Sequence, residues 1–359
     1  MLELDPVIED ILLKSLSGKE IGREQAIELM GAIDKEYHAL CYVANELRRE
    51  SVGDIVTYVQ NRNIYSTNIC TSTCKFCSFR SDNGYVVEVG DILEKCATPG
   101  ITEICMQGGL NPELGADYFI GLIDSIKERY PNLHIHAFSP AEVDHMAAVS
   151  GVGHKEVLGR LKEAGLGSMP GTAAEVLDDD VRSVICPDKI KTARWVEIIK
   201  DAHKIGIPTT STIMYGHVES IENRVDHLLT LRDIQKETGG FTEFIPLSFI
   251  PGNSLGEDYG IMGASGADDV RMIAVSRLLF NGLIDNIQTA WVKFGRKFAQ
   301  TMLLCGANDL GGTLYQESIS KASGGIHGEY ISVEQLRNMT EPLNRTLRQR
   351  DTLYNLFEG

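Results

Sequence analysis

The sequence of 359 residues lacks long apolar runs and carries little positive charge. No run approaches the roughly 20 apolar residues that cross a bilayer, so no membrane-spanning helix is expected. Lys and Arg number 34 against 50 Asp and Glu, which gives a net charge of −16. This charge disfavours nucleic acid or an anionic membrane as a partner, because both would repel the chain. Residues 1–20 contain no basic stretch followed by an apolar one, so we expect no signal peptide and a cytoplasmic location.

No low-complexity tract, proline-rich linker or charge block divides the chain, which is long enough for one large α/β barrel or for two domains. The first 60 residues have helical patterns, and Ser17–Glu20 has the form of a capping box at a helix start. From residue 63, short β-rich runs alternate with helical patterns in eight units over about 250 residues, the size of a (β/α)8 barrel. The expected strands are 63–69, 102–106, 133–138, 166–169, 208–214, 242–248, 285–290 and 303–307.

We therefore predict an α/β protein with a (β/α)8 TIM-type barrel. Residues 1–60 are expected to form an N-terminal helical segment packed on the barrel, 61–315 the barrel, and 316–359 a C-terminal helical extension. A doubly wound open sheet is the alternative. The absence of G-x-G-x-x-G after the first expected strand weakens the dinucleotide-binding version of that alternative. In a barrel, the chemistry lies at the carboxyl ends of the strands.

Three of the eight cysteines lie close together after the first expected strand. Cys70, Cys74 and Cys77 form C-x3-C-x2-C, and soft thiolates this close indicate a soft metal centre. Structural zinc and ferredoxin clusters take a fourth protein ligand, and neither Cys96 nor Asp82 completes a familiar pattern. Three thiolates on a [4Fe–4S] cluster leave one iron open for a substrate or cofactor. The other five cysteines are expected to be buried thiols.

With Phe76 before its last cysteine, this loop resembles the radical S-adenosylmethionine (SAM) enzymes, whose signature is C-x3-C-x-aromatic-C after the first barrel strand. The resemblance implies that the three cysteines hold a [4Fe–4S] cluster and that SAM chelates the open iron. In that family, one electron cleaves the sulfonium, and the 5′-deoxyadenosyl radical that results abstracts a hydrogen. The electron would come from a reductant such as ferredoxin or flavodoxin.

Further cofactor-binding residues are expected where later strands end. Gln107, Gly108 and Gly109 stand where the superfamily often carries G-G-E, and the glycines allow close approach to the methionine amino group. The family glutamate is absent, which favours a contact through backbone carbonyls, and a tight βα turn is the alternative. Ser139 and Thr172 follow the third and fourth expected strands and are also expected to line the SAM site.

Glu175 and Arg194 form a second expected cofactor-binding pair. A guanidinium suits the methionine carboxylate through a bidentate contact, while Glu175 would hold Arg194 or meet the ribose. Related enzymes of the hydrogenase-maturase type place Glu and Arg at this spacing. The alternative for Arg194 is an ordinary surface arginine.

Candidate substrate contacts follow the fifth and last expected strands. His217 is proposed as a catalytic residue, a polar contact or a proton acceptor near neutral pH, with a structural histidine as the alternative. Tyr215 is a candidate wall of a dry pocket. Asn308 and Asp309 begin a glycine-rich stretch, where a carboxylate disfavours phosphate and a neutral polyol or pyrimidine fits better. A structural loop is the alternative there.

The resemblance runs from about residue 55 to the C-terminus. It points to the branch that holds both components of deazaflavin synthase, aminofutalosine synthase and dehypoxanthine futalosine cyclase, and it is strongest to the second deazaflavin synthase component. It implies that L-tyrosine is cleaved at Cα–Cβ, that its 4-hydroxybenzyl group joins 5-amino-6-(D-ribitylamino)uracil with loss of 2-iminoacetate, and that the first component is the functional partner. The cyclase shares G-A-N-D at 306–309, so it is harder to exclude than aminofutalosine synthase, which differs in this segment. The segments that carry the resemblance are 61–79, 169–195, 207–219, 244–254 and 306–328.

Overall fold

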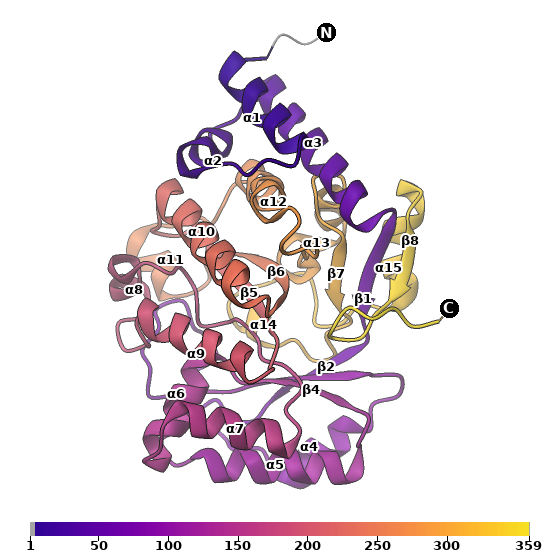
Figure 1. The fold of residues 1–359 in the computed structure, drawn as a ribbon. Coiled ribbons are helices and arrows are strands. Elements are labelled where there is room, and N and C mark those ends of the chain that lie inside the picture. Colours follow the sequence, from indigo (N-terminus) through magenta and orange to yellow (C-terminus); the bar gives the residue numbers. More distant parts are fainter. Residues whose placement is uncertain (1–3, 359) are drawn as a thin grey trace.

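Three helices at the N-terminal end form a small bundle beside a larger α/β body (Figure 1). The computed structural model describes residues 4–358, so the outermost residues of both terminal segments lie outside it. The capping-box prediction at Ser17 is wrong, because Ser17 caps the carboxyl end of α1, and Gly22 precedes the next helix. The bundle consists of α1 (Pro6–Leu16), α2 (Arg23–Met30) and α3 (Asp34–Val52).

The strands of the body pair in parallel, as the alternating pattern predicts. They form three groups, in the orders β2-β3-β4, β5-β6 and β7-β1-β8. The strands are β1 (Ile55–Val59), β2 (Asn61–Tyr65), β3 (Glu103–Gln107), β4 (His134–Ala137), β5 (Thr209–Tyr215), β6 (Phe241–Ser248), β7 (Asp309–Gly312) and β8 (Thr346–Gln349).

Two of the expected strands are reduced to single bridges that link these groups. Ser168 pairs with β4 and Met169 with β5, while Ile287 pairs with β6 and Gln288 with β7, all in parallel. Only one residue separates β1 from β2, and β1 pairs with β7 at Thr57. The parallel pairings therefore pass through eight segments in chain order, and the last segment, β7, pairs with β1 in the first. The segments are β1 with β2, β3, β4, 168–169, β5, β6, 287–288 and β7.

Two predictions near the C-terminus are wrong. Residues 303–307 are not a strand, because their apolar run forms the buried turn after α13, and β7 begins only at Asp309. An apolar run this short does not distinguish a strand from the end of a buried helix. The C-terminal extension is not wholly helical either, because β8 follows α15 and pairs with β1, which itself lies within the segment predicted as helical up to residue 60.

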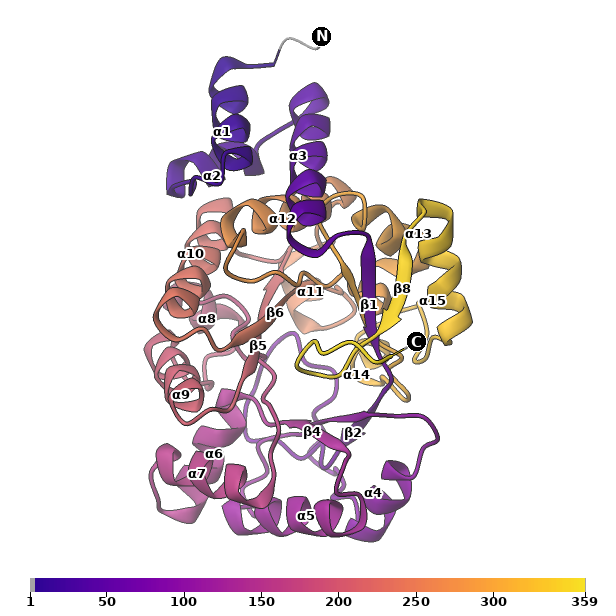
Figure 2. The same ribbon diagram turned by 45° about the vertical axis from the view of Figure 1, so that its right-hand side comes forward.

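The helices enclose the strands and bury two apolar cores. In Figure 2, α4–α7 lie at the end opposite the N-terminal bundle, with the strands between. The smaller core lies beneath α4–α7, and the larger joins β5 and β6 to α10, α12 and the bundle. No helix within residues 4–358 has the length and apolar character to cross a membrane. The remaining helices are α4 (Val89–Cys96), α5 (Ala116–Arg129), α6 (Pro140–Ser150), α7 (His154–Ala164), α8 (Asp179–Ile185), α9 (Thr192–Lys204), α10 (Ile221–Thr238), α11 (Ser254–Tyr259), α12 (Gly266–Phe280), α13 (Trp291–Met302), α14 (Ile319–Ala322), α15 (Val333–Thr340) and the 3-10 turn Glu341–Leu343.

Candidate active site

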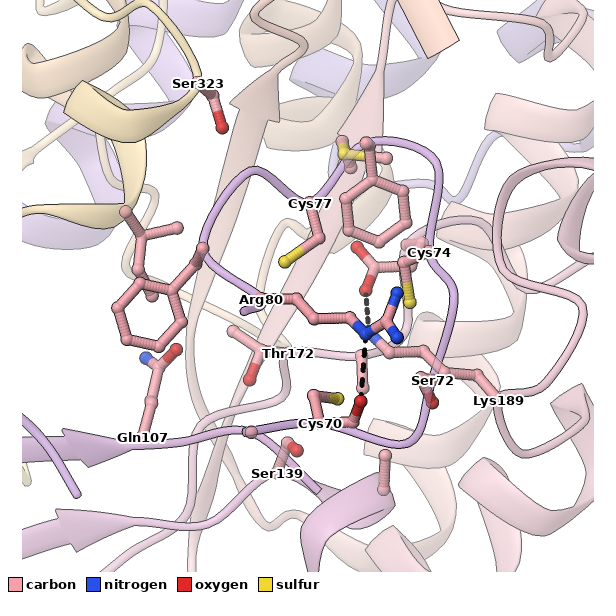
Figure 3. A pocket seen from close by; sticks show the side chains of 18 of the residues that line it. Cys70, Ser72, Cys74, Cys77, Arg80, Gln107, Ser139, Thr172, Lys189 and Ser323 are labelled. Atoms are coloured by element: carbon pink, nitrogen blue, oxygen red, sulfur yellow. Dashed lines mark hydrogen bonds and ion pairs between the residues drawn. The ribbon is translucent and has the colours of Figure 1, made fainter. Parts of the chain in front are cut away.

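A cavity of about 260 Å³ lies where the loops after β2, β3, β4 and β6 and residues 172–189 meet β5, α13 and α14. The cavity lies at the carboxyl ends of the strands, where the sequence analysis predicts the catalytic residues. Figure 3 shows the three sulfur atoms of the cysteine loop within this region. The predicted site residues that line the cavity are Cys70, Cys74, Phe76, Cys77, Gln107, Gly108, Gly109, Ser139, Thr172 and Glu175.

The cysteine loop is held from three directions by backbone hydrogen bonds. The Thr71 N–H donates to the carbonyl of Leu110 at 3.0 Å, and the Lys75 N–H donates to that of Ile185 at 2.9 Å. From a third side, the Leu255 N–H donates to the Lys75 carbonyl at 3.0 Å. Leu110 follows β3, Ile185 ends α8, and Leu255 lies in α11 after β6. The cysteine loop is thus held by three segments that are far apart in the sequence.

The donor set fits a cluster with one open iron. Among the described residues, the cavity lining contains no fourth cysteine and no histidine. Both candidates for a fourth ligand lie elsewhere, since Cys96 is buried in the core beneath α4–α7 and Asp82 pairs with Arg80 at 2.6 Å. Burial raises the pKa of Cys74 to about 12, and the nearby Lys189 opposes that rise. Iron binding therefore has to displace a proton from this thiol.

Gly109 allows the turn after β3 to pack on the cysteine loop. A Cβ at this position would overlap the carbonyl oxygen of Ile69 and lie 3.0 Å from the Cys70 Cβ. The Gly109 N–H donates to the Thr67 carbonyl at 2.8 Å, which joins the two loops directly. The close approach that the structure shows is to the cysteine loop, and the predicted approach to the methionine amino group of SAM stays a prediction.

Glu142 is a buried residue of the cavity lining that the sequence analysis missed. The N–H and Oγ of Ser139, which caps α6, each donate to Oε2 of Glu142 at 2.7 Å. The N–H of Gly108 donates to Oε1 at 3.0 Å. Burial raises the pKa of Glu142, although these hydrogen bonds oppose the rise. The signal was available, because Ser139 and Glu142 have capping-box spacing.

The predicted pair of Glu175 with Arg194 is wrong, and Lys189 takes the place of the arginine. Nζ of Lys189 lies 2.8 Å from Oε1 of Glu175 and 5.2 Å from the ring centroid of Phe76. Figure 3 shows Lys189 beside the cysteine loop. Arg194 lies outside the cavity lining and pairs instead with Asp144 at 2.7 Å. Lys189 precedes α9 in an irregular loop, where no periodic pattern marked it.

The structure does not bring His217 or Tyr215 to the cavity. The His217 side chain is buried, with Nε2 donating to the Met214 carbonyl at 3.0 Å and Nδ1 lying 3.0 Å from Glu219. The Tyr215 hydroxyl donates to Asp269 at 2.7 Å. Protein groups occupy the hydrogen-bonding atoms of both residues, which is the structural alternative weighed for His217.

Asn308 and Asp309 also lie away from the cavity, among buried charged side chains. Nη2 of Arg277 donates to Oδ1 of Asn308 at 2.8 Å. Asp309 pairs with Arg350 at 2.6 Å and accepts a hydrogen bond from the Thr57 hydroxyl. These pairings fit the alternative of a structural loop. No pattern in the sequence indicates that Arg350, which lies beyond α15, pairs with Asp309.

The comparisons with known proteins agree with this site. Residues 64–231 match the family model of the radical SAM superfamily, and residues 238–348 match that of the CofH/MqnC C-terminal region. The fold and the three-cysteine loop thus define a radical SAM protein, with a [4Fe–4S] cluster and SAM as its cofactors. Within that superfamily, the chain belongs to the family of the 5-amino-6-(D-ribitylamino)uracil–L-tyrosine 4-hydroxyphenyl transferases.

Three curated relatives show this membership. The transferase 1 of Methanosarcina acetivorans is 50% identical over 357 residues, which cover 98% of this chain and 94% of the relative. The transferase of Archaeoglobus fulgidus is 52% identical over 319 residues, with coverage of 88% and 93%. That of Methanocaldococcus jannaschii is 48% identical over 353 residues, with coverage of 95% and 98%.

Solved structures agree on the fold. Methylornithine synthase (PylB) superposes with a TM-score of 0.74 at 17% identity, covering 94% of this chain and 97% of that one. The [FeFe]-hydrogenase maturase HydG of Carboxydothermus hydrogenoformans gives a TM-score of 0.75 at 15% identity, covering 97% and 80%. At this identity the likeness concerns the fold alone.

Proposed function

We propose that the chain cleaves L-tyrosine and joins its 4-hydroxybenzyl group to 5-amino-6-(D-ribitylamino)uracil, releasing 2-iminoacetate, in the biosynthesis of a deazaflavin cofactor. The observation that carries this proposal is the identity of about half of all residues with relatives of that name along nearly the full chain. The three-cysteine cavity supports it, because it brings three thiols and an apolar wall together at the carboxyl ends of the strands. The substrates are thus the amino acid and the diaminouracil.

Each wall of the cavity has a proposed task. Cys70, Cys74 and Cys77 would hold the cluster, which together with SAM supplies the hydrogen-abstracting radical when both are bound. The turn at Gly108 and Gly109 keeps the backbone beside the cysteine loop. Gln107, Ser139 and Thr172 offer polar atoms to SAM, while the Glu175–Lys189 pair places one charge of each sign beside it. Apolar lining residues exclude water from the radical chemistry: Phe76, Leu247, Phe249 and Ile250.

The architecture and partners belong to the same proposal. We describe the succession of parallel pairings as a (β/α)8 barrel of residues 61–315, in which the parallel bridge between Arg62 and Tyr315 joins the first and last segments. Residues 1–60, which include β1, and 316–359 would pack on it. A ferredoxin or flavodoxin would donate the electron, and the first deazaflavin synthase component would use the product. A cytoplasmic location is supported by the eight cysteines, none of which forms a disulfide within residues 4–358.

The test is an anaerobic assay of the reconstituted enzyme. We expect about four iron atoms per chain, as a [4Fe–4S] cluster requires. We also expect tyrosine-dependent transfer to the diaminouracil, and no turnover of dehypoxanthine futalosine. Turnover of the futalosine without tyrosine would overturn the proposal in favour of the cyclase.

Cys74→Ala tests the metal-binding role in the same assay. We expect loss of the cluster absorbance and of 5′-deoxyadenosine release, because two thiolates remain where three are needed. Cys96→Ala is the matched control, since Cys96 is buried in the core beneath α4–α7. The iron content of this variant should equal that of the wild type. Undiminished deoxyadenosine release from the Cys74 variant would refute the assignment of this ligand.

A further inference from the structure

Lys293 is a cavity-lining cation without a partner among residues 4–358. It lies in the first turn of α13, is partly buried, and lines the same cavity as the cysteine loop. Its ammonium makes no hydrogen bond or ion pair with any residue in the described part of the chain. Burial lowers the pKa of Lys293, and the charges of Glu317 and Glu175 oppose that effect from a distance.

The nearest carboxylates have other partners. Glu175 pairs with Lys189 at 2.8 Å, and both carboxylate oxygens of Glu317 accept from the Ser320 N–H at 3.2 Å. A partly buried ammonium without a paired counter-charge is costly, because it loses part of its hydration to the walls of the cavity. An anionic group of a bound ligand would remove that cost.

The position of Lys293 indicates which ligand brings the anion. The cysteines, Gly108 and Lys189 lie in the part of the chain that matches the superfamily model, whereas Lys293 lies in the part that matches the family-specific C-terminal region. Among the described residues that this second part contributes to the cavity, Lys293 is the charged one. The others are apolar or neutral: Leu247, Ser248, Phe249, Ile250, Asn253, Ile319 and Ser323.

We propose that Lys293 binds the carboxylate of the amino-acid substrate. The inference rests on the proposed function, in which one substrate is a zwitterionic amino acid and the other, a diaminouracil with a ribityl chain, carries no acid group. Held at its carboxylate by Lys293, the amino acid has its Cα–Cβ bond placed between α13 and the cysteine side of the cavity. Lys293 is then a substrate-binding residue that selects amino acids over the corresponding amines.

The test measures binding of L-tyrosine and of tyramine, which lacks the carboxylate, to the reconstituted holoenzyme by anaerobic equilibrium dialysis. In Lys293→Gln, the Kd for tyrosine should rise about 30-fold or more, as for the loss of one partner of an enclosed charge pair. The Kd for tyramine should stay within about twofold. Lys293→Arg should recover part of the affinity for tyrosine. Lys297→Gln, an exposed lysine of the same helix, is the matched control and should bind as the wild type does.

The Kd for SAM, measured on the same samples, separates the outcomes. An unchanged SAM affinity with weakened tyrosine binding supports the proposal. Weakened SAM binding would assign Lys293 to the cofactor, and equal effects on tyrosine and tyramine would assign it a packing role; either result overturns the proposal. If wild type binds tyrosine and Lys293→Gln binds it equally well, only this inference fails. If wild type does not bind tyrosine at all, the proposed function fails with it.

Discussion

A single glycine, Gly109, allows the turn after β3 to pack on the cysteine loop. In Gly109→Ala, the new methyl group would overlap the Ile69 carbonyl, which belongs to backbone and cannot rotate away. We expect a loss of about 1–3 kcal/mol in the free energy of unfolding, as for other overpacked sites. The cysteine loop has to shift with Ile69, so iron content after reconstitution should also fall.

Gly159→Ala is the control for this substitution. Gly159 lies inside α7 with open space where a Cβ would go, so alanine should stabilise the chain by about 0.5–1 kcal/mol and leave iron binding unchanged. Normal iron content in Gly109→Ala, measured by the same iron assay, would contradict the packing role of Gly109.

Local spacing reveals some site residues and hides others. The cysteines and Ser139 were predictable, because each belongs to a short motif within a single loop or helix start. Lys189 and Lys293 were not, because their places in the cavity depend on which distant segments the fold brings together. His217 follows β5 as predicted, whereas Asp309 is the first residue of β7, and both side chains turn to buried partners, which strand position alone does not reveal.

Among the secondary-structure elements, β8 positions the buried positive charge of Arg350, the residue that follows it. Arg350, directly after β8, is buried beside Asp309 at 2.6 Å and Glu243 at 3.6 Å. In Arg350→Met, both carboxylates lose their cation, and we expect the free energy of unfolding to fall by about 3–5 kcal/mol. Urea denaturation measures the change.

Two companion variants make this experiment specific. Adding Asp309→Asn to Arg350→Met should restore part of the loss, because one uncompensated charge is removed. Arg337→Met, at an exposed position in α15, should change stability by about 1 kcal/mol or less. Equal losses in the Arg337 and Arg350 variants would show that the buried ion pair does not support the fold.

Sequence periodicity was sufficient to predict most strands and helices of the α/β body. It failed for strands that are defined by pairing with distant parts of the chain. The alternation of β-rich and helical patterns located β3, β4, β5 and β6 to within one or two residues. It misplaced β7 and missed β8 as a strand, because these short segments are defined by their pairing with β1 rather than by a pattern of their own.

The molecule as a whole buries neutral histidines, which makes its stability depend on pH. Burial lowers the pKa of His136 and His203 to about 4 and that of His227 to about 3, against about 6.5 in an unfolded chain. Below pH 6.5 the unfolded chain therefore binds protons that the folded one does not. The free energy of unfolding should fall as the pH drops from 6.5 towards 4.

His203 alone accounts for about 2 kcal/mol of this fall at pH 5. Urea denaturation of wild type and His203→Gln at pH 7.5 and pH 5 measures it as the difference between the two pH-induced losses. The exposed His38→Gln should retain the full fall of the wild type. The same pH-induced loss in the His203 variant would rule out this residue as a source of acid sensitivity.

The pairing of β1 also determines when this strand can find its partners during synthesis of the chain. Thr57, in the middle of β1, pairs with Asp309 and Arg348, so the first strand to leave the ribosome meets these neighbours only when the last strands emerge. At ordinary translation rates, that interval is roughly ten to fifty seconds. During this time the edges of β1 are open to other nascent chains, which makes this strand the expected target of chaperones and the first site of aggregation in a truncated product.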